Sequence, residues 1–283
     1  MRVILDTSVF HRFDYSSDIL YQLKRNGKIK VYVTPMLLEE SLKLMPHSSA
    51  SGDLMKRLQF IRDVSSEGWF EDNFAIFKSE LNLLPRRKDY QFLHSRAEKY
   101  FKDNIQLILS GGRLDTNVER EARTVLEDNK KKAENLRTIG LDMREAITQG
   151  VKELGMKHKH ITETWQDFKT RGLNKWGVGL IRRKGCYSKM FQLSALLVWA
   201  INKRKCPYFY DWVQGLLYAE FYSMKYPQLK VDLNAQADIQ HLIFLRDTDA
   251  IISEEKNFMR KAWEDLYAPL GKKYFNVFEA AKL

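Results

Sequence analysis

The chain begins with a short apolar run followed by an acid and two hydroxyl residues, Val3-Ile4-Leu5-Asp6-Thr7-Ser8. The three large apolar residues favour a short buried strand, and an acid and two hydroxyl side chains follow where that strand ends. A helix is expected over residues 17–25, a break at Asn26 and Gly27, and a second strand over residues 29–33. A strand, a helix and a strand in this order indicate a parallel sheet.

The same alternation returns near the end of the chain. Residues 234–246 are expected to form a helix, residues 250–253 a strand, residues 257–267 a helix and residues 274–278 a last strand. Four short strands that alternate with helices predict an α/β fold, specifically a three-layer α/β/α arrangement with a short parallel sheet and right-handed crossovers.

The middle of the chain follows a different pattern. A loop is predicted at residues 46–52, which are rich in Ser, Pro and Gly, and helical spacing dominates from there to Pro227. We therefore predict a discontinuous α/β domain of residues 1–68 and 228–283, interrupted by a mostly α-helical insertion at residues 69–227. The apolar run at residues 190–201 is too short to span a membrane and is predicted to be a buried helix.

Positive charge is concentrated in this insertion. The 283 residues include 47 Lys and Arg against 36 Asp and Glu, which gives a net charge of +11. Residues 70–225 hold 29 of the basic residues and 19 of the acidic ones, so nearly all of the excess lies there. Such a balance favours a polyanionic partner, with nucleic acid the leading candidate, and makes binding depend on salt.

Basic triplets alternate with aromatic residues inside the insertion, at residues 86–88, 130–132, 182–184 and 203–205. RNA binding uses this combination, because cations neutralise the backbone while aromatic rings stack on bases. Trp176 and Tyr187 are the aromatic candidates, and the other aromatic residues are expected to belong mostly to the core. The alternative is a solvated helical surface without a ligand.

The two cysteines, Cys186 and Cys206, have neither the spacing of a C-x-x-C motif nor the density of a disulfide-rich secreted protein. A reducing, cytoplasmic location is therefore expected. The sequence predicts no membrane segment.

The residues after Asp6 exclude several nucleotide folds. No glycine occurs between Asp6 and Phe13, so the phosphate loops of dinucleotide-binding and P-loop proteins are absent there. A haloacid-dehalogenase phosphatase would carry a second acid two residues after the first, where this chain has Ser8. A strand-end aspartate beside two hydroxyl groups instead suits Mg²⁺ or Mn²⁺, which prefer oxygen ligands.

Three more acids are expected at the same edge of the sheet. Glu40 lies on a helix that Thr34 and Pro35 begin, Asp238 starts the helix before the third predicted strand, and Glu255 follows that strand. Since the carboxyl ends of parallel strands share one edge, Asp6 and these three acids could face one crevice. Metal-dependent phosphodiester hydrolysis requires several carboxylates that converge in this way.

Other residues offer alternatives to this set. Glu39 competes with Glu40 for the inward-facing position, and Asp249 is a further acid at the head of a predicted strand. His241 follows Asp238 on the same helical face and is expected to be structural. His158 and His160 have a spacing compatible with a metal, but they lie in a basic stretch and are expected to face solvent.

The order of these motifs resembles that in the PIN domain family, whose members are metal-dependent ribonucleases. Residues 3–8 are similar to the family's opening strand with its first metal-binding Asp, and residues 33–40 to its second-acid segment, which selects Glu40 over Glu39. Asp238 looks like the third acid. Residues 253–258 resemble the closing Thr/Ser-x-Asp-x-x-Phe motif, with Glu255 where members commonly have Asp or Asn. The resemblance covers under half of the chain.

The resemblance implies an Mg²⁺- or Mn²⁺-dependent endonuclease that cleaves RNA rather than DNA. Asp6, Glu40, Asp238 and Glu255 would bind the metal, while Ser8 and Ser253 would position a carboxylate or a metal-bound water. One alternative is a non-catalytic nucleic-acid-binding protein on the same scaffold. Another is a toxin-like nuclease restrained by an inhibitory protein partner, for which residues 190–201 could form the contact surface.

Overall fold

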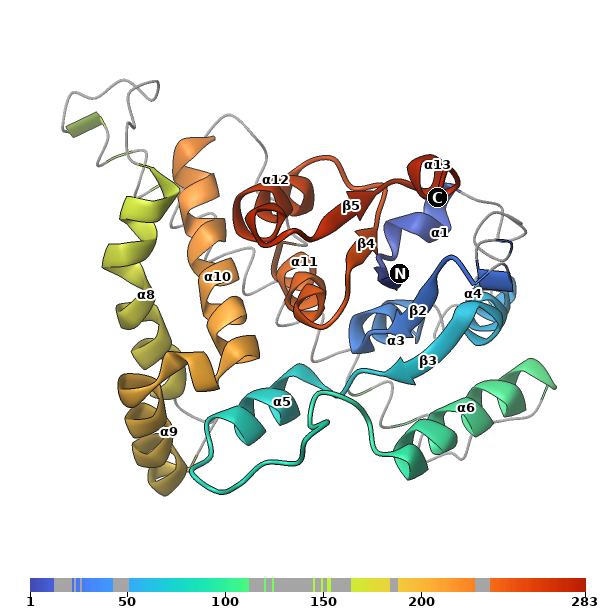
Figure 1. Ribbon diagram of the computed structural model, residues 1–283, viewed down its shortest axis with the longest axis horizontal. Helices are drawn as coiled ribbons and strands as arrows, with labels where there is room; N and C mark the ends of the chain where they lie inside the picture. Colours follow the sequence, from blue (N-terminus) through green and yellow to red (C-terminus); the bar gives the residue numbers. More distant parts are fainter. Residues whose placement is uncertain are drawn as a thin grey trace.

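A five-stranded parallel sheet lies at the centre of the molecule (Figure 1). The computed structural model describes residues 1–12, 27–42, 51–111, 164–183, 188–226 and 235–283, together with residues 22, 24, 25, 120, 124, 145, 149, 152 and 153. The strand order is β3-β2-β1-β4-β5. The strands are β1 (Arg2–Leu5), β2 (Lys30–Val33), β3 (Ser65–Trp69), β4 (Ala250–Ile252) and β5 (Lys273–Phe275).

Helices make up most of the remaining described structure. The α-helices are α1 (Ser8–Arg12), α3 (Pro35–Leu42), α4 (Ser51–Val64), α5 (Asn73–Glu80), α6 (Ser95–Leu109), α8 (Trp165–Ile181), α9 (Lys189–Ile201), α10 (Pro207–Lys225), α11 (Ala235–Leu242), α12 (Phe258–Leu266) and α13 (Val277–Ala280). Three short 3-10 helices are η3 (Lys203–Lys205), η4 (Ile243–Arg246) and η5 (Ala268–Leu270).

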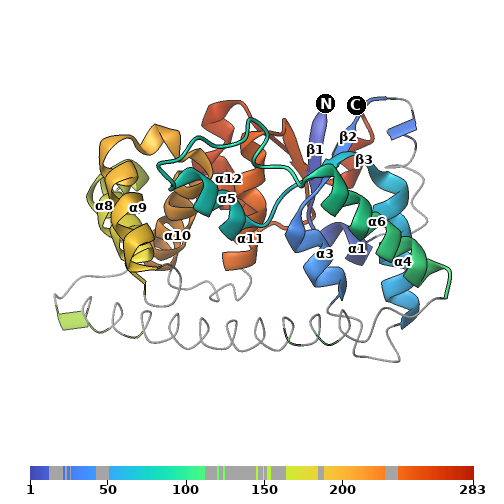
Figure 2. The same ribbon diagram turned by 90° about the horizontal axis from the view of Figure 1, so that it is seen from below.

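Both faces of the sheet are covered. Successive side chains of a strand point to opposite faces, so Val3 and Leu5 belong to one buried cluster and Ile4 to the other. The Val3 cluster includes residues of α4 and α13, and the Ile4 cluster includes residues of α10, α11 and α12. Figures 1 and 2 show α11 and α12 on one side of the sheet and α4 on the other. The predicted α/β class with a parallel sheet is confirmed, and the layers are consistent with an α/β/α arrangement.

One strand of the sheet was not predicted. β3 pairs in parallel with β2 at the edge of the sheet, with an irregular register between Val31 and Val33. The prediction of four strands was therefore wrong by this one. β3 lies within residues that were expected to be helical or irregular, because its sequence Ser-Ser-Glu-Gly-Trp lacks the apolar alternation of a strand.

The last predicted strand is shorter than expected, because a helix begins inside it. β5 ends at Phe275, and residues 277–280 form α13. Asn276 accepts a hydrogen bond from the backbone of Glu279, whose side chain accepts one from the backbone of Asn276. This capping box satisfies backbone N–H groups at the start of the helix and so ends the strand.

Two other predicted boundaries differ. Helix α4 begins at Ser51, so the end of the predicted loop at residues 46–52 is helical, with Asp53 in the first turn favoured by the helix dipole. The predicted helix at residues 234–246 is an α-helix only to Leu242 and continues as η4. The predicted helix at residues 17–25 lies largely outside the described residues.

Helix α9 is confirmed as a helix, but the prediction that it is buried was wrong. Ala195 and Trp199 face the core, whereas Met190, Leu193 and Ile201 are each exposed by more than 70%. One side of the helix packs on α8, and the other side has no covering element in the described part of the chain. Among the described helices, none has the length and apolar character needed to cross a membrane.

Helices from residues 69–227 share a core with the helices that follow them. Phe77 of α5 stacks on Trp212 of α10 with ring centroids 4.9 Å apart, and Phe70 lies 4.5 Å from Phe244 of η4. Aromatic pairs at these separations contribute beyond the area they bury. The described helices of the predicted insertion therefore pack directly against the α/β part of the chain.

A glycine on α8 allows α9 to pack closely. A Cβ atom added to Gly177 would lie 2.4 Å from two ring carbons of Trp199, whereas one added to Gly179 would meet nothing within 4 Å. We expect Gly177→Ala to destabilise the protein by roughly 1–3 kcal/mol, because the buried indole ring must move. The control Gly179→Ala should stabilise it by about 0.5–1 kcal/mol through helix propensity. Urea unfolding of both variants checks this, and equal effects would contradict the packing.

Candidate functional site

Asp6 occupies the carboxyl end of β1, next to the carboxyl end of β4. Its backbone N–H donates to the carbonyl of Ile252 at 3.0 Å, which continues the pairing of the two strands. Parallel pairing therefore fixes Asp6 beside Ser253, and both residues are buried. The Asp6 side chain is only 5% exposed.

Two hydroxyl groups hold the Asp6 carboxylate by one oxygen. Ser253 Oγ donates to Asp6 Oδ2 at 2.8 Å, and Ser8 Oγ donates to the same oxygen. The two hydroxyl oxygens lie 3.2 Å apart. Ser8 is the first residue of α1, so the turn after β1 brings its side chain back toward the strand end. The predicted grouping of Asp6, Ser8 and Ser253 is present in the structure.

The second oxygen of Asp6 has a different environment. In the described part of the chain, no hydrogen-bond donor contacts Asp6 Oδ1 and no Lys or Arg forms an ion pair with this carboxylate. Burial of a carboxylate is costly unless a cation or enough donors compensate the charge. Asp6 therefore presents, at the edge of the sheet, one carboxylate oxygen that no donor in the described part of the chain contacts.

The loop after β4 is ordered around the same serines. Ser8 Oγ accepts a hydrogen bond from the backbone of Glu254 at 2.9 Å, and Ser253 Oγ accepts one from the backbone of Glu255 at 3.0 Å. The side chain of Glu255 accepts from the backbone of Asn257, and its carbonyl accepts from Tyr274. Glu255 thus lies two residues after Ser253, which contacts Asp6, but its carboxylate is bonded within its own turn.

The first turn of α11 carries Asp238, which is 8% exposed. His241, one turn later, has Nδ1 3.2 Å from Thr34 Oγ1 at the carboxyl end of β2. Thr34 Oγ1 also accepts a hydrogen bond from the backbone of Leu37 at 3.3 Å, and a hydroxyl oxygen can take part in both contacts. This bond holds α11 against the start of α3. His241 is buried, and in the described part of the chain its Nε2 has no hydrogen-bond partner; its structural role stays a prediction.

Helix α3, which begins after the carboxyl end of β2, carries Glu40, whereas Asp249 lies at the amino end of β4. Glu40 is half-buried on α3, as is its neighbour Glu39. Asp249 lies at the opposite edge of the sheet, where it accepts a hydrogen bond from the backbone of Arg2 at 2.7 Å and forms an ion pair with its side chain. Although burial acts to raise the pKa of Asp249, these contacts with Arg2 lower it. Asp249 is therefore not part of the candidate site.

Carboxylates are the kind of ligand that a divalent metal prefers, but the described residues do not gather enough of them in one place to form a complete site. Within the described residues, no three His, Cys, Asp or Glu side chains lie close enough together to hold a metal ion. Mg²⁺, however, keeps several water ligands and is commonly held by one or two carboxylates. The second oxygen of Asp6, which no described donor contacts, fits one such ligand, and Asp238, Glu40 and Glu255 lie on α11, on α3 and after β4.

Several of the predicted nucleic-acid contacts have structural partners. Arg86 donates to the carbonyl of Lys205 at 2.5 Å, and Arg87 donates to that of Asp89 at 2.8 Å. Of the aromatic residues, Trp199, Tyr208 and Trp212 are buried, in agreement with the prediction that most belong to the core. Trp176 is partly exposed. Residues 130–132, 158, 160, 184, 186 and 187 lie outside the described residues.

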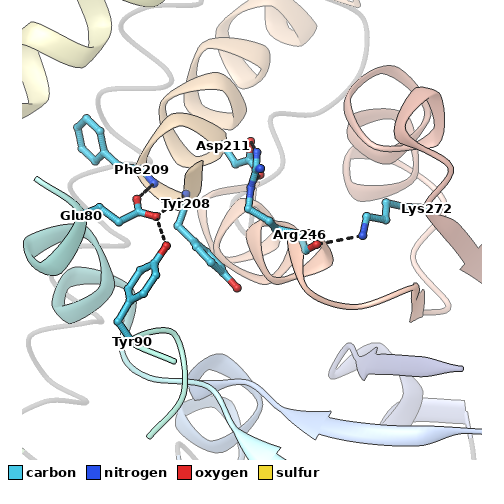
Figure 3. A network of polar contacts seen from close by, with 7 residues as sticks. All are labelled: Glu80, Tyr90, Tyr208, Phe209, Asp211, Arg246 and Lys272. Carbon is cyan, nitrogen blue, oxygen red and sulfur yellow. Dashed lines mark hydrogen bonds and ion pairs between the residues drawn. The ribbon is translucent and has the colours of Figure 1, made fainter. Parts of the chain in front are cut away.

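A buried acid that the sequence did not single out joins α5 to α10 (Figure 3). Glu80 is 2% exposed and accepts hydrogen bonds from the backbone of Tyr208 at 3.0 Å, the backbone of Phe209 at 2.8 Å and the hydroxyl of Tyr90 at 2.7 Å. Its carboxylate therefore caps the first turn of the 19-residue helix α10. Burial raises the pKa of Glu80 to about 7, against the lowering effect of these donors.

The same network continues to the sheet. Arg246 donates to both carboxylate oxygens of Asp211, at 2.8 and 2.7 Å, and Lys272 donates to the carbonyls of Arg246 and Thr248 at 3.0 and 2.7 Å. Burial lowers the pKa of Lys272. Figure 3 shows these residues on one path from α10 to the segment after α12. The network is structural, since it lies away from Asp6 and satisfies its own polar groups.

Glu80 should make stability depend on pH. Its pKa is about 7 when folded and near 4.5 when unfolded, so the folded state binds more protons between these values. The stability present below pH 4.5 is lost as pH rises to 7, by roughly 3 kcal/mol. In Glu80→Gln this pH-dependent contribution to stability is absent, because the glutamine side chain does not titrate. We expect the difference in unfolding free energy between wild type and variant to fall by that amount from pH 4.5 to 7.5, measured by urea denaturation; a constant difference would contradict it.

Comparisons of the chain with family models, with curated proteins and with solved structures find no match.

Proposed function

We propose that this protein is a metal-dependent endonuclease with a PIN-like fold, which hydrolyses phosphodiester bonds of RNA. The observation that carries the proposal is the Asp6 carboxylate, which is buried, is held through one oxygen by Ser8 and Ser253, and has a second oxygen that no described donor contacts. A buried carboxylate of this kind suits a cation as its partner.

The topology supports the same proposal. β1 and β4 are adjacent and parallel at the middle of the sheet, so their carboxyl ends form one edge, where α/β folds commonly bind their ligands. Asp6 and Ser253 lie at that edge. The Thr34 to His241 hydrogen bond holds the α11 segment that carries Asp238 against the end of β2.

In this proposal Asp6 would bind Mg²⁺ or Mn²⁺ directly, and Asp238, Glu40 and Glu255 would be the further carboxylates that reach the ion or its water ligands. Such an ion lowers the pKa of a bound water and neutralises charge on the phosphate. The chain's own contribution is to orient Asp6: the hydroxyls of Ser8 and Ser253 fix Oδ2, and their bonds to the backbone of residues 254 and 255 fix the hydroxyls. The net charge of +11 favours attraction of a polyanion.

A non-catalytic nucleic-acid-binding protein is the second candidate. It is favoured by the observation that no three metal-binding side chains gather within the described residues. Restraint by a protein partner is a third possibility, favoured by the exposed apolar side chains of Met190, Leu193 and Ile201 on α9.

The test is a cleavage assay on labelled single-stranded and structured RNA and DNA, with Mg²⁺, with Mn²⁺ and with a chelator. We expect cleavage of RNA with either metal and none with the chelator. Binding without cleavage in every condition would favour the second candidate. Cleavage in the presence of the chelator would contradict the metal dependence.

A further inference from the structure

A groove lies between α8 and α10, far along the chain from Asp6 and built from none of the residues of that site. Its volume is about 540 Å³, within the range of small-molecule sites. Phe168, Leu180 and Leu217 supply apolar walls, and Arg171, Lys175 and Glu220 supply the charged groups. A groove with apolar walls and a few charged groups suits a ligand that is partly apolar and partly ionic.

Two glycines of α8 shape this groove. A Cβ atom at Gly172 would lie 2.6 Å from Leu217 Cδ1, so the absence of a side chain lets α8 and α10 pack closely at that point. Gly179, two turns further along the same side of α8, would place a Cβ atom in open space. The groove is therefore closed at its floor near Gly172, and the missing side chain at Gly179 leaves room at its rim.

A hydrogen bond fixes the acid of the groove. Trp176 Nε1 donates to Glu220 Oε2 at 2.8 Å, which links α8 to α10. Trp176 and Glu220 are both partly exposed. A carboxylate has two oxygens with about four lone-pair directions, so this bond leaves acceptor capacity for a ligand that carries N–H groups.

The cations of the groove lie on its exposed rim. Arg171 and Lys175 are four residues apart on α8, so their side chains project from the same side of the helix. Both are exposed. Two adjacent cations at the mouth of a groove attract an anionic group such as a phosphate.

We propose that this groove binds a guanine base together with its phosphate, from a free nucleotide or from single-stranded RNA. Guanine presents two adjacent N–H donors on its Watson–Crick edge, which match a carboxylate; the other bases place an acceptor beside their donor, which a carboxylate repels. Phe168 and Trp176 offer aromatic faces for the base, and Arg171 and Lys175 offer charge for the phosphate. Binding of single-stranded RNA in this groove rests on the proposed function, whereas binding of a free nucleotide does not.

The test is calorimetric titration of the full-length protein with GMP, AMP, CMP, UMP and guanosine, in the presence of a chelator so that cleavage plays no part. Short RNAs with and without guanine are titrated alongside. We expect GMP to bind at least about tenfold more tightly than the other mononucleotides, since a bidentate hydrogen-bonded pair discriminates between bases. Guanosine should bind more weakly than GMP because it lacks the phosphate.

Three variants locate the binding. Gly179→Leu should abolish it by filling the groove, while Asn174→Leu, on another side of α8, should leave it intact. Glu220→Gln keeps an oxygen that can accept the Trp176 hydrogen bond, so it should fold normally and lose the preference for guanine.

The results distinguish a free nucleotide from RNA as the ligand and show whether the groove binds guanine. Binding of guanine-containing RNA but not GMP, lost in Gly179→Leu, supports the RNA source. Equal affinity for all four nucleotides, binding that survives Gly179→Leu, or no binding of any nucleotide or RNA overturns the proposal. These results are independent of cleavage, so a failure here is distinct from a failure of the metal-dependent nuclease.

Discussion

Replacing Asp6 with Asn is expected to reduce metal-dependent cleavage by at least about a thousandfold while nucleic-acid binding is retained. The amide has the size of the carboxylate, and its oxygen can still accept from Ser8 and Ser253, so the turn after β1 should stay in place. The negative charge that would attract the metal is lost. Initial cleavage rates with Mg²⁺, together with RNA binding in chelator, measure the two effects separately.

Asp249→Asn is the matched control for this variant. Asp249 is an aspartate of the same sheet, but it lies at the amino end of β4 and is engaged with Arg2. Its replacement should cost a fraction of 1 kcal/mol of stability and leave the cleavage rate within about twofold. Cleavage that survives in Asp6→Asn, or that is lost equally in Asp249→Asn, would contradict the assignment of Asp6.

The largest effect on stability is expected from Arg246→Ala. Asp211 is 3% exposed and depends on Arg246 for both of its oxygens. Burial raises the pKa of Asp211, and the Arg246 contacts oppose that effect. Without Arg246 the acid would be buried without its ion-pair partner, which typically costs about 3–5 kcal/mol. Denaturant unfolding at pH 7 measures this loss as a lower transition midpoint.

Lys99→Ala provides the comparison for an exposed ion pair. Lys99 bonds to Asp103 at 2.6 Å one turn along α6, and both side chains are more than half exposed. Its removal should cost less than about 1 kcal/mol. If Lys99→Ala and Arg246→Ala destabilised the protein equally, the buried network of Asp211 and Arg246 would not have the importance that its geometry indicates.

A strand could be predicted from the sequence where its own residues favour an extended conformation. β1, β2 and β4 contain β-branched apolar runs, and the structure confirms all three. β3 has little of this signal: Gly68 adopts a φ of 64°, and pairing with β2, rather than intrinsic preference, holds the segment in the sheet. The helix at residues 277–280 was predictable in principle, because Asn276 and Glu279 have the spacing of a capping box.

Contacts between residues far apart in the chain are harder to predict from the sequence than contacts between neighbours. Ser8 lies two residues from Asp6, so their grouping is local, and Ser253 follows from the pairing of parallel strands. Glu80, in contrast, bonds to Tyr208 from 128 residues away, and no local pattern indicates that partner. The exposed side of α9 was missed for a related reason: the apolar run does not reveal which of its faces another helix covers.

Direct metal binding tests whether the buried Asp6 carboxylate holds a divalent cation at the carboxyl edge of the sheet. Isothermal titration of Mn²⁺ into the wild type, Asp6→Asn and Asp249→Asn, without nucleic acid, measures it independently of any substrate. Saturable binding is expected for the wild type and for Asp249→Asn, and its loss is expected in Asp6→Asn. No saturable binding to the wild type, or equal binding to Asp6→Asn, would contradict it.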